Sequence, residues 1–526
     1  MNERPNGSEI RNNPVPTGGG AKIEYTLKEG IFALISLVLA YFISDTLGKN
    51  SGLGVTVAVF AFAAFVTAYL IITKKKTALR SVVVLALLLV TSLVFVLFDN
   101  YELKSCTLLF DMVLGMYWMF TSLGGSTSER FDYLALFDAL KAVVILPVSC
   151  FVRIFPAIFS GLSGKKGDRG KSTNRRPLYI FLGIVAAIVP SAIVLSELAN
   201  DTAFYSFIEN LLNMRNERLS EIMTTALFAV PIGCYLFGGL FGATRLPKKH
   251  IMTYESTHRE AEKLRILPLL MVCTAITPLL IIYLLYFFSQ MPYFLSGFMN
   301  VRPEEYTFAE YARSGFFELC KVSVVNLIVI GVAEMFSKRN GKKPLSLKIY
   351  ISIFSVFTLA LMAIAQSKLI LYIRAYGMTP LRVMTFWFTL VLGAVFVFIL
   401  LYQFLPKINF TRCVATALAV LFCALIFSDT DAMIARYNIG QYKSGEVYML
   451  DTDLLLYQLS DSADAVILDE IDSLPAGKTK ADLTNYMKKK TEKAEEQSGT
   501  TDWGDWNLAS YLAEKKLVDK YGSGAR

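Results

Sequence analysis

Residues 52–73 read GLGVTVAVFAFAAFVTAYLIIT, an apolar stretch without a single charged side chain. A bilayer span needs about 20 mostly apolar residues, because every backbone amide in hydrocarbon must bond within its own helix. This stretch therefore predicts a helix that crosses a membrane. Similar stretches recur along the chain, and together they predict about eleven spans, at residues 31–47, 52–73, 79–98, 103–124, 178–199, 222–244, 267–290, 316–336, 347–374, 382–404 and 411–428.

The composition of the whole chain agrees with a membrane protein. Of its 526 residues, 54% are hydrophobic and 18% are charged, whereas about a quarter of the residues are charged in soluble proteins. We expect an all-α fold, a polytopic transmembrane helical bundle with a small helical C-terminal domain outside the membrane. The expected divisions are a disordered N-terminal tail at 1–26, a transmembrane domain at 27–428 and an extramembrane tail at 429–526.

The C-terminal tail is helical by its periodicity and too polar to span. Residues 481–496 are amphipathic, and residues 506–521 repeat apolar side chains near one face. Trp503 and Trp506 supply large apolar area for packing. We expect the tail to be a small domain docked on the membrane part.

A twelfth apolar block, residues 138–160, differs from the others. Pro147, Arg153 and Pro156 interrupt it, and such breaks suit an interfacial amphipathic helix or a re-entrant segment. If the block crossed the bilayer, every later loop would change sides, and the Lys- and Arg-rich loops after it would lie outside, against the rule that these residues accumulate in inner loops. We therefore predict that it does not span.

The distribution of Lys and Arg predicts the orientation. With the N-terminus inside, about thirty basic residues fall in inner loops and about eight in outer loops, as expected for cytoplasmic loops. The N-terminus is then cytoplasmic and the tail is extracytoplasmic. The tail has a net charge of −6 and the rest of the chain +15. Basic inner loops indicate contact with membrane lipids, and we expect no nucleic-acid partner.

The residues that carry common catalytic or metal chemistry are sparse. The two histidines, His250 and His258, share one inner loop, and the seven cysteines all lie in apolar segments without C-x-x-C spacing. Zinc sites and Ser-His-Asp hydrolases need histidine or paired cysteine ligands. We expect no metal site, no bound cofactor and no catalytic residue set. A pair of small residues, Gly238 and Gly242, could let two helices approach closely.

Two of the ionisable residues inside predicted spans are candidates for a functional role. Asp111 lies near the middle of 103–124, and Lys321 lies near the outer end of 316–336. A central charge costs roughly 2.5–3.5 kcal/mol on insertion scales, so such residues often mark ion or proton paths. The alternative is that Lys321 extends to the interface and Asp111 is satisfied inside the bundle.

A polar cluster is predicted at the outer face, where arginines are otherwise scarce. Converging guanidinium groups bind carboxylate or phosphate bidentately. They could bind an anionic ligand, or pair with nearby acidic residues and lock the tail onto the membrane part. The cluster consists of Glu310, Arg313, Glu318, Arg374, Arg382, Arg436 and Asn438.

The same stretches resemble a bacterial family of multi-pass membrane proteins. They are YARSGFFEL at 311–319 with Asn326 in the following helix, YGMTPLR at 376–382, ARYN at 435–438 and DWN at 505–507. The chain is similar over residues 180–520 to the family catalogued as domain of unknown function 4173, to which family 4153 is related. Met378 and Pro380 depart from the family pattern. The resemblance implies a bacterial plasma-membrane protein but no reaction, substrate or cofactor.

Three functions remain open from the sequence. A transporter or permease-like protein is the leading interpretation, with Asp111 and the outer arginines along its path. A structural or signalling protein would use the tail as an interaction surface for a protein partner. A membrane-embedded enzyme for lipid-linked or wall-polymer substrates would bind phosphate through Arg313, Arg382 and Arg436.

Overall fold

Every regular element in the described part of the chain is a helix. The computed structural model describes residues 25–48, 52–75, 77–127, 131–162, 217–245, 262–298, 316–339, 343–447, 449–497 and 502–522, with isolated positions at 194, 198, 204 and 259. Within these ranges, 9 helices are long and apolar enough to cross a membrane, or up to 11 if two bent pairs each count as one span. The all-α polytopic fold is therefore confirmed. The predicted span 178–199 lies outside the described residues except for positions 194 and 198.

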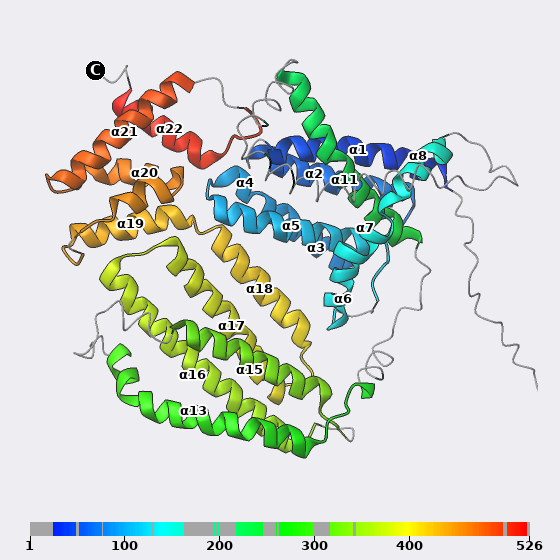
Figure 1. Cartoon of the computed structure of the whole chain (residues 1–526), viewed down its shortest axis with the longest axis vertical. Helices are drawn as coiled ribbons and strands as arrows, with labels where there is room; N and C mark the ends of the chain where they lie inside the picture. The colour runs from blue at the N-terminus through cyan, green and yellow to red at the C-terminus, as the bar shows by residue number, and fades with distance from the viewer. Residues whose placement is uncertain are drawn as a thin grey trace, which may run out of the picture.

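The first bundle gathers the N-terminal helices around an aromatic core (Figure 1). Phe62, Trp118 and Phe120 are buried at its centre, and Gly115 lets Phe62 pack against the backbone of its neighbour helix. The helices are α1 (Leu27–Gly48), α2 (Leu53–Ile72), α3 (Leu79–Ser92), α4 (Val94–Leu97), α5 (Tyr101–Ser122) and α11 (Glu217–Arg245).

The second bundle has a closely packed core with one buried polar chain. Its helices are α13 (Leu269–Phe298), α15 (Phe316–Phe336), α16 (Leu345–Tyr376) and α17 (Pro380–Phe404). Tyr283 donates its hydroxyl to Asn326 Oδ1 at 2.5 Å, and Asn326 Nδ2 donates to Thr358 Oγ1 at 2.8 Å. Amide and hydroxyl groups in hydrocarbon need such partners. The three side chains therefore fix the register of α13, α15 and α16.

Helix α18 (Phe410–Ile426) leads from the second bundle into the tail. It meets α19 (Thr430–Lys443) at a 60° bend, where Asp429 has a φ of 45°. The tail continues with a π-helical turn (Leu454–Gln458), α20 (Asp461–Glu470), α21 (Lys478–Gln497) and α22 (Leu508–Tyr521). Leu483, Met487 and Leu517 are fully buried in its core. The helices predicted at 481–496 and 506–521 are thus confirmed.

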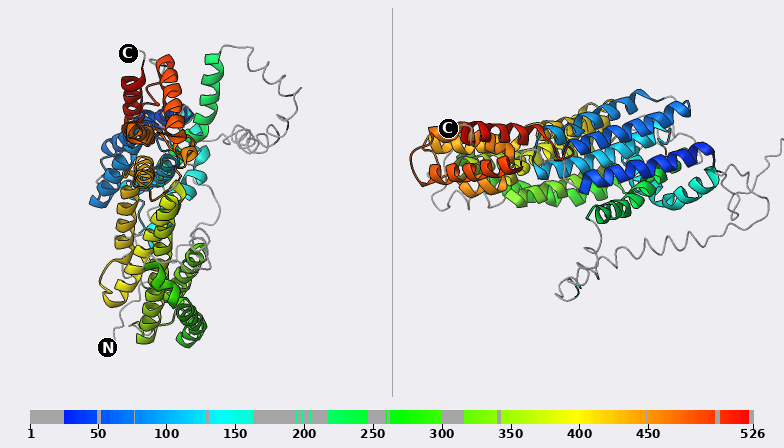
Figure 2. Two further views of the ribbon diagram at one scale, coloured as in Figure 1. Left: turned by 90° about the vertical axis from the view of Figure 1, so that its left-hand side faces the viewer. Right: turned by 90° about the horizontal axis from the view of Figure 1, so that it is seen from above.

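The tail packs at one end of the long helices (Figure 2, right). We call this the tail end, which holds the starts of α2 and α5 and the end of α16. The opposite end holds the start of α1 and the end of α11, where Arg245 Nε lies 2.7 Å from Glu29 Oε1. The loops predicted to be cytoplasmic gather here, so we call it the basic end. Its described Lys and Arg residues include Lys28, Lys74, Lys75, Arg80, Lys141, Arg153, Arg245, Arg265, Lys338, Arg339, Lys343, Lys348, Lys407 and Arg412.

The block predicted not to span is broken in several places. It comprises α6 (Leu134–Leu140), a π-helical turn (Lys141–Ile145), α7 (Leu146–Ser149), a 3₁₀ turn and α8 (Ile154–Leu162), with a 53° bend. Figure 1 shows it crosswise to α1, at the end away from the tail. Proline and π-turns are common causes of such breaks.

The neighbours of this block lie in the half of the first bundle nearer the basic end. Tyr235 donates its hydroxyl to the carbonyl of Val143 at 2.8 Å, and the α8 side chains pack around Ala33 and Phe241. Helix α5 ends at the basic end, whereas α11 begins at the tail end, where Ser44 Oγ donates to Thr225 O at 3.1 Å. The end of α5 and the start of α11 therefore lie at opposite ends of the first bundle, and the prediction that the block does not span stays a prediction.

The prediction for the two small residues is confirmed. A Cβ on Gly238 would lie 2.7 Å from the carbonyl oxygen of Pro147, and one on Gly242 would lie 3.1 Å from Leu146 Cβ. Only glycine allows α7 to approach α11 this closely.

Candidate functional site

The described polar residues at the tail end connect the tail to three loops of the membrane domain. The first connection joins two of the motifs singled out in the sequence. Asn438 Oδ1 accepts from the Met378 amide at 2.6 Å, and its Nδ2 donates to the Met378 carbonyl at 2.8 Å. Gly377 has a φ of +77°, and a Cβ there would lie 2.7 Å from Asn438 Oδ1. The loop between α16 and α17 is thereby fixed to α19.

Arg382 stabilises the same loop from the other side. Its Nη1 donates to the Tyr376 carbonyl at 3.0 Å and to the Gly377 carbonyl, and its guanidinium lies 4.0 Å from the centre of the Tyr372 ring. These are C-terminal carbonyls of α16 and its following residue, which have no partner within the helix. Arg382 therefore caps a helix end, and part of its donor capacity is used by its own chain.

The second connection joins α19 to the loop before α5. Asn100 Oδ1 caps α5 by accepting from the Leu103 amide at 2.8 Å, and its Nδ2 donates to Asp431 Oδ1 at 2.7 Å. The other oxygen of Asp431 accepts from the Ser460 amide at 3.0 Å. Asp431 is only 3% exposed, so its two donors satisfy a carboxylate that water does not reach freely.

The third connection joins α22 to the same loop. Asn507 Oδ1 caps α22 by accepting from the Ser510 amide at 2.8 Å, and its Nδ2 donates to Asp99 Oδ1 at 3.2 Å. Asp99 also lies 3.3 Å from Lys104 Nζ. Burial raises the pKa of Asp99 above its ordinary value, and the nearby ammonium of Lys104 opposes this shift.

Backbone groups complete the attachment at the start of α2. The amide of Leu53 donates to the Trp506 carbonyl at 2.9 Å, and the amide of Gly54 donates to the Gly504 carbonyl at 3.0 Å. The first amides of a helix have no acceptor within it, so the tail supplies acceptors that α2 lacks. We call these three side-chain connections and this backbone pairing the tail lock.

An ion triad lies inside the tail, with Asp464 buried and with Asp461 and Lys490 partly exposed. Lys490 Nζ is 2.6 Å from Asp461 Oδ1 and also contacts Asp464. Burial raises the pKa of Asp464 to about 6, although Lys490 opposes the shift. Burial alone would raise the pKa of Asp461, but Lys490 outweighs it and lowers that pKa. The two carboxylates outweigh the burial of Lys490 and raise its pKa.

Two other members of the predicted polar cluster are exposed, and the side chains of three are not described. Arg374 and Arg436 are exposed. Glu310 and Arg313 lie outside the described residues. The structure describes the backbone of Glu318 in α15 but not its side chain. The prediction that these arginines share an acidic group remains a prediction.

Asp111 lies in the interior of the first bundle, facing α3. It is 4% exposed, and the Thr91 hydroxyl lies 2.5 Å from its Oδ1. Its Oδ2 has no hydrogen-bond partner among the described residues. The rings of Phe110 and Phe422 lie 4.6 Å apart, so this region also borders α18. Lys321, by contrast, is exposed on the surface of α15, a position from which its side chain can extend towards the interface.

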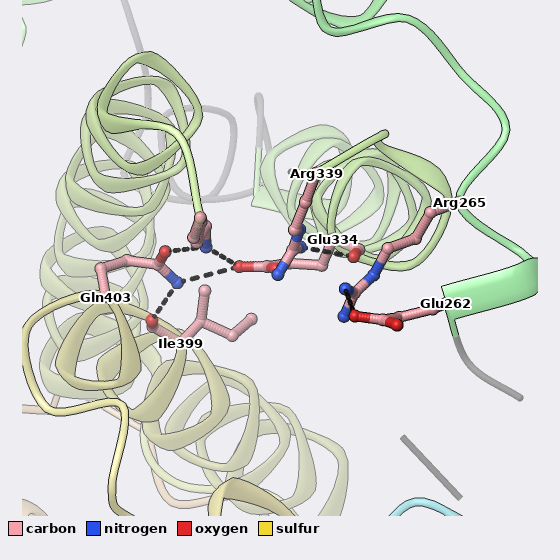
Figure 3. Close-up of polar contacts among 7 residues, drawn as sticks. Glu262, Arg265, Glu334, Arg339, Ile399 and Gln403 are labelled. Atoms are coloured by element: carbon pink, nitrogen blue, oxygen red, sulfur yellow. Dashed lines mark hydrogen bonds and ion pairs between the residues drawn. The ribbon is translucent and has the colours of Figure 1, made fainter. Parts of the chain in front are cut away.

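The basic end of the second bundle has its own charged junction (Figure 3). The carboxylate of Glu334 contacts Arg339 and Lys343, and Gln403 Nε2 donates to it at 3.3 Å. Gln403 Nε2 also donates to the Ile399 carbonyl at 2.9 Å. These contacts join the end of α15, the start of α16 and the end of α17, so the junction closes this end of the bundle.

Two further features bear on chemistry. In the described ranges, no group of three or more His, Cys, Asp or Glu side chains is placed to hold a metal ion. A gap between α15, α16 and α17, beside Ser323, Met362 and Thr389, is too small to hold a water molecule. The described part of the second bundle is thus packed as a solid core at this place.

One family model matches most of the chain. The model described as domain of unknown function 4153 matches residues 83–470. The chain belongs to this family. Comparison with curated proteins and with solved structures finds no match. The expected kinship with family 4173 remains a prediction.

The match of family 4153 extends further towards the N-terminus than the motifs had indicated. It includes Asp99, Asn100, Asp431 and Asn438, but not Asn507. Two of the three tail-lock connections thus lie wholly within the matched region of this family 4153 member. The family description states no reaction and no ligand.

Sequence reasoning missed Asp99 and Asn100, and it noted Asn507 only as part of the DWN motif. It selected charged residues that are rare on the outer face, whereas the structure uses Asp99, Asn100, Asp431 and Asn507. A signal was present: Asn100 and Asn507 each directly precede a helix, where asparagine is a favoured N-cap. Capping uses only the oxygen of each side-chain amide and leaves its nitrogen free to donate to a carboxylate.

Proposed function

We propose that this family 4153 protein holds its C-terminal tail as a fixed platform on the outer face of the bacterial plasma membrane, where the tail binds a protein partner in a structural or signalling role. The observation that carries the proposal is the tail lock. It joins the tail to the starts of α2 and α5 and to the loop after α16. A tether that only linked two independent domains would not need hydrogen bonds to three separate loops.

The orientation is part of the proposal. The basic residues gather at the end opposite the tail, and Lys and Arg are retained in cytoplasmic loops. The platform surface is then extracytoplasmic, and the N-terminus is cytoplasmic. The acidic tail and the basic opposite end support this assignment.

The experiment is complementation of a strain that lacks the gene. We expect the double variant Asp431→Ala/Asn507→Ala to reach normal membrane abundance yet fail to restore the deletion phenotype, because its tail is released. Asp519→Ala and Asn485→Ala change exposed residues of the same types in the tail, and they should restore it. Full restoration by the released variant would contradict a fixed platform.

A second function, ion- or proton-coupled transport, is favoured by Asp111 alone. An ionisable group inside a membrane span, with one oxygen unpaired, is a functional candidate by default. The test uses proteoliposomes with a pH-sensitive dye trapped inside and an imposed pH gradient. Proton flux in the wild type that is lost in Asp111→Asn, with the tail still docked, would favour transport over the platform. Equal flux in both proteins would remove this candidate.

A further inference from the structure

One edge of the tail exposes large apolar side chains close to the ends of membrane spans. Its members are Trp503, Trp506, Leu508, Tyr511 and Leu512, which are between 37% and 54% exposed. The rings of Trp506 and Tyr511 lie 6.2 Å apart. We call this surface the apolar edge. Exposed apolar clusters of this kind usually mark a contact with another phase or molecule.

The depth of the apolar edge follows from its contacts with α1 and α2. The Trp506 carbonyl accepts from Leu53, and Leu53 is the first residue of the candidate span Leu53–Ile72. Trp503 stacks on Phe42 with ring centres 6.3 Å apart and planes 8° apart, and Phe42 lies within the candidate span Leu27–Leu47. The edge is therefore continuous with the apolar belt of the membrane domain, at the depth where spans end.

The exposed face of α22 changes character along the helix. Leu508, Tyr511 and Leu512 lie near its attached start, and the exposed positions further along the helix are Glu514, Lys515, Val518 and Asp519. Residues three, four and seven apart share one helix face. This face is apolar beside the membrane domain and mostly charged away from it, where Val518 is its one exposed apolar residue.

A further aromatic side chain lies nearby on the membrane domain. Tyr101, the first residue of α5, is 77% exposed, and it follows the loop that Asn507 binds through Asp99. Trp and Tyr are enriched where bilayer hydrocarbon meets head groups, because their rings are apolar and their polar atoms reach water.

We propose that the apolar edge is buried in lipid, at the boundary between head groups and acyl chains of the leaflet at the tail end. The tail is then held by two attachments, one to the protein through the tail lock and one to the bilayer. A protein partner or a second copy of the chain would not explain why Trp503 and Trp506 continue the apolar belt at the ends of two candidate spans. The platform proposed above would be fixed in tilt as well as in position.

The experiment is a spin-label scan along α22 in lipid nanodiscs. The seven native cysteines are replaced by alanine, and single cysteines at Leu508, Tyr511, Leu512, Lys515 and Asp519 carry the label. Oxygen partitions into hydrocarbon and a charged nickel complex stays in water, so their relative relaxation effects report depth. We expect oxygen to dominate at Leu508, Tyr511 and Leu512, and the nickel complex at Lys515 and Asp519.

The possible outcomes distinguish whether the apolar edge contacts lipid, water or protein. Domination by the nickel complex at all five positions would place the edge in water and overturn the proposal. Low access for both reagents at the apolar positions would mean burial against protein and would also overturn it. A second measurement avoids cysteines: brominated lipids should quench more fluorescence in the wild type than in Trp503→Phe/Trp506→Phe. Equal quenching in these two proteins would count against lipid burial.

Discussion

Asn507 offers the sharpest test of the tail lock, because its two functions can be separated by substitution. Asn507→Ser keeps a side-chain oxygen to cap α22 but removes the Nδ2 that donates to Asp99 at 3.2 Å. The lost bond joins an amide to a carboxylate, in a residue that is only 5% exposed. Bonds to charged groups contribute about 1.5–3 kcal/mol. We expect the docked state to lose about 2 kcal/mol, which is roughly a 30-fold change in the undocking equilibrium.

Hydrogen exchange at Leu53 and Gly54 measures undocking directly. These amides are the first two of α2, and their acceptors are the tail carbonyls of Trp506 and Gly504. No carbonyl within α2 can protect them, so their exchange reports tail release. With the protein in nanodiscs, exchange at both amides should be about 30-fold faster in Asn507→Ser than in the wild type.

Matched variants separate docking from the general effects of substitution. Asn485 is an exposed asparagine in the middle of α21, and Asn485→Ser should leave exchange at Leu53 unchanged. Asn507→Asp keeps the cap but turns a second carboxylate towards Asp99, so it should speed exchange more than Asn507→Ser. The reasoning fails if exchange at Leu53 and Gly54 stays within about threefold of wild type in both Asn507 variants.

Three other predictions concern neighbouring parts of the molecule. Gly377→Ala meets Asn438 Oδ1 at 2.7 Å and needs a φ of +77°, so it should lose about 1–3 kcal/mol of stability, whereas Gly393→Ala in α17 has space and should melt like wild type. Burial raises the pKa of Asp464 to about 6, so the folded tail binds an extra proton between pH 4 and 6. The stability of the tail should therefore fall as pH rises through this range. Rates of proteolysis of the tail measured against pH should show this slope, and Asp464→Asn should flatten it. Asp111→Asn is nearly isosteric and keeps an oxygen for Thr91, so its thermal midpoint should stay near wild type, whereas Thr91→Val leaves the carboxyl without its hydroxyl donor and should lower the midpoint by a few degrees.

The fold was predictable because the bilayer imposes one simple requirement on the chain. Apolar runs such as 52–73 and 382–404 can satisfy their backbone only as helices, and the structure places α2 and α17 there. The break between α7 and α8 was also predictable, because Pro147 and Pro156 on either side of it lack the amide that an uninterrupted helix needs. The bend at Asp429 was not, because no residue type at that place forces it.

The candidate site was only partly predictable, because a charge pattern does not specify partners. Asn438 was singled out, and the structure pairs it with Met378. Arg382 was also singled out, and among the described residues its guanidinium caps the end of α16. Neutral amides such as Asn100 and Asn507 carry no charge signal, and their partners come from segments hundreds of residues away.

The most direct test of the proposed platform is to determine by thiol labelling on which side of the membrane the docked tail lies. Ser444 in the tail and Lys74 at the basic end are both exposed. Each is replaced by cysteine in a chain whose seven native cysteines are alanine, and intact cells are treated with a membrane-impermeant thiol reagent. The account predicts that Ser444→Cys reacts in intact cells, whereas Lys74→Cys reacts only after the membrane is opened. Reaction of Lys74→Cys in intact cells, with Ser444→Cys protected, would contradict it.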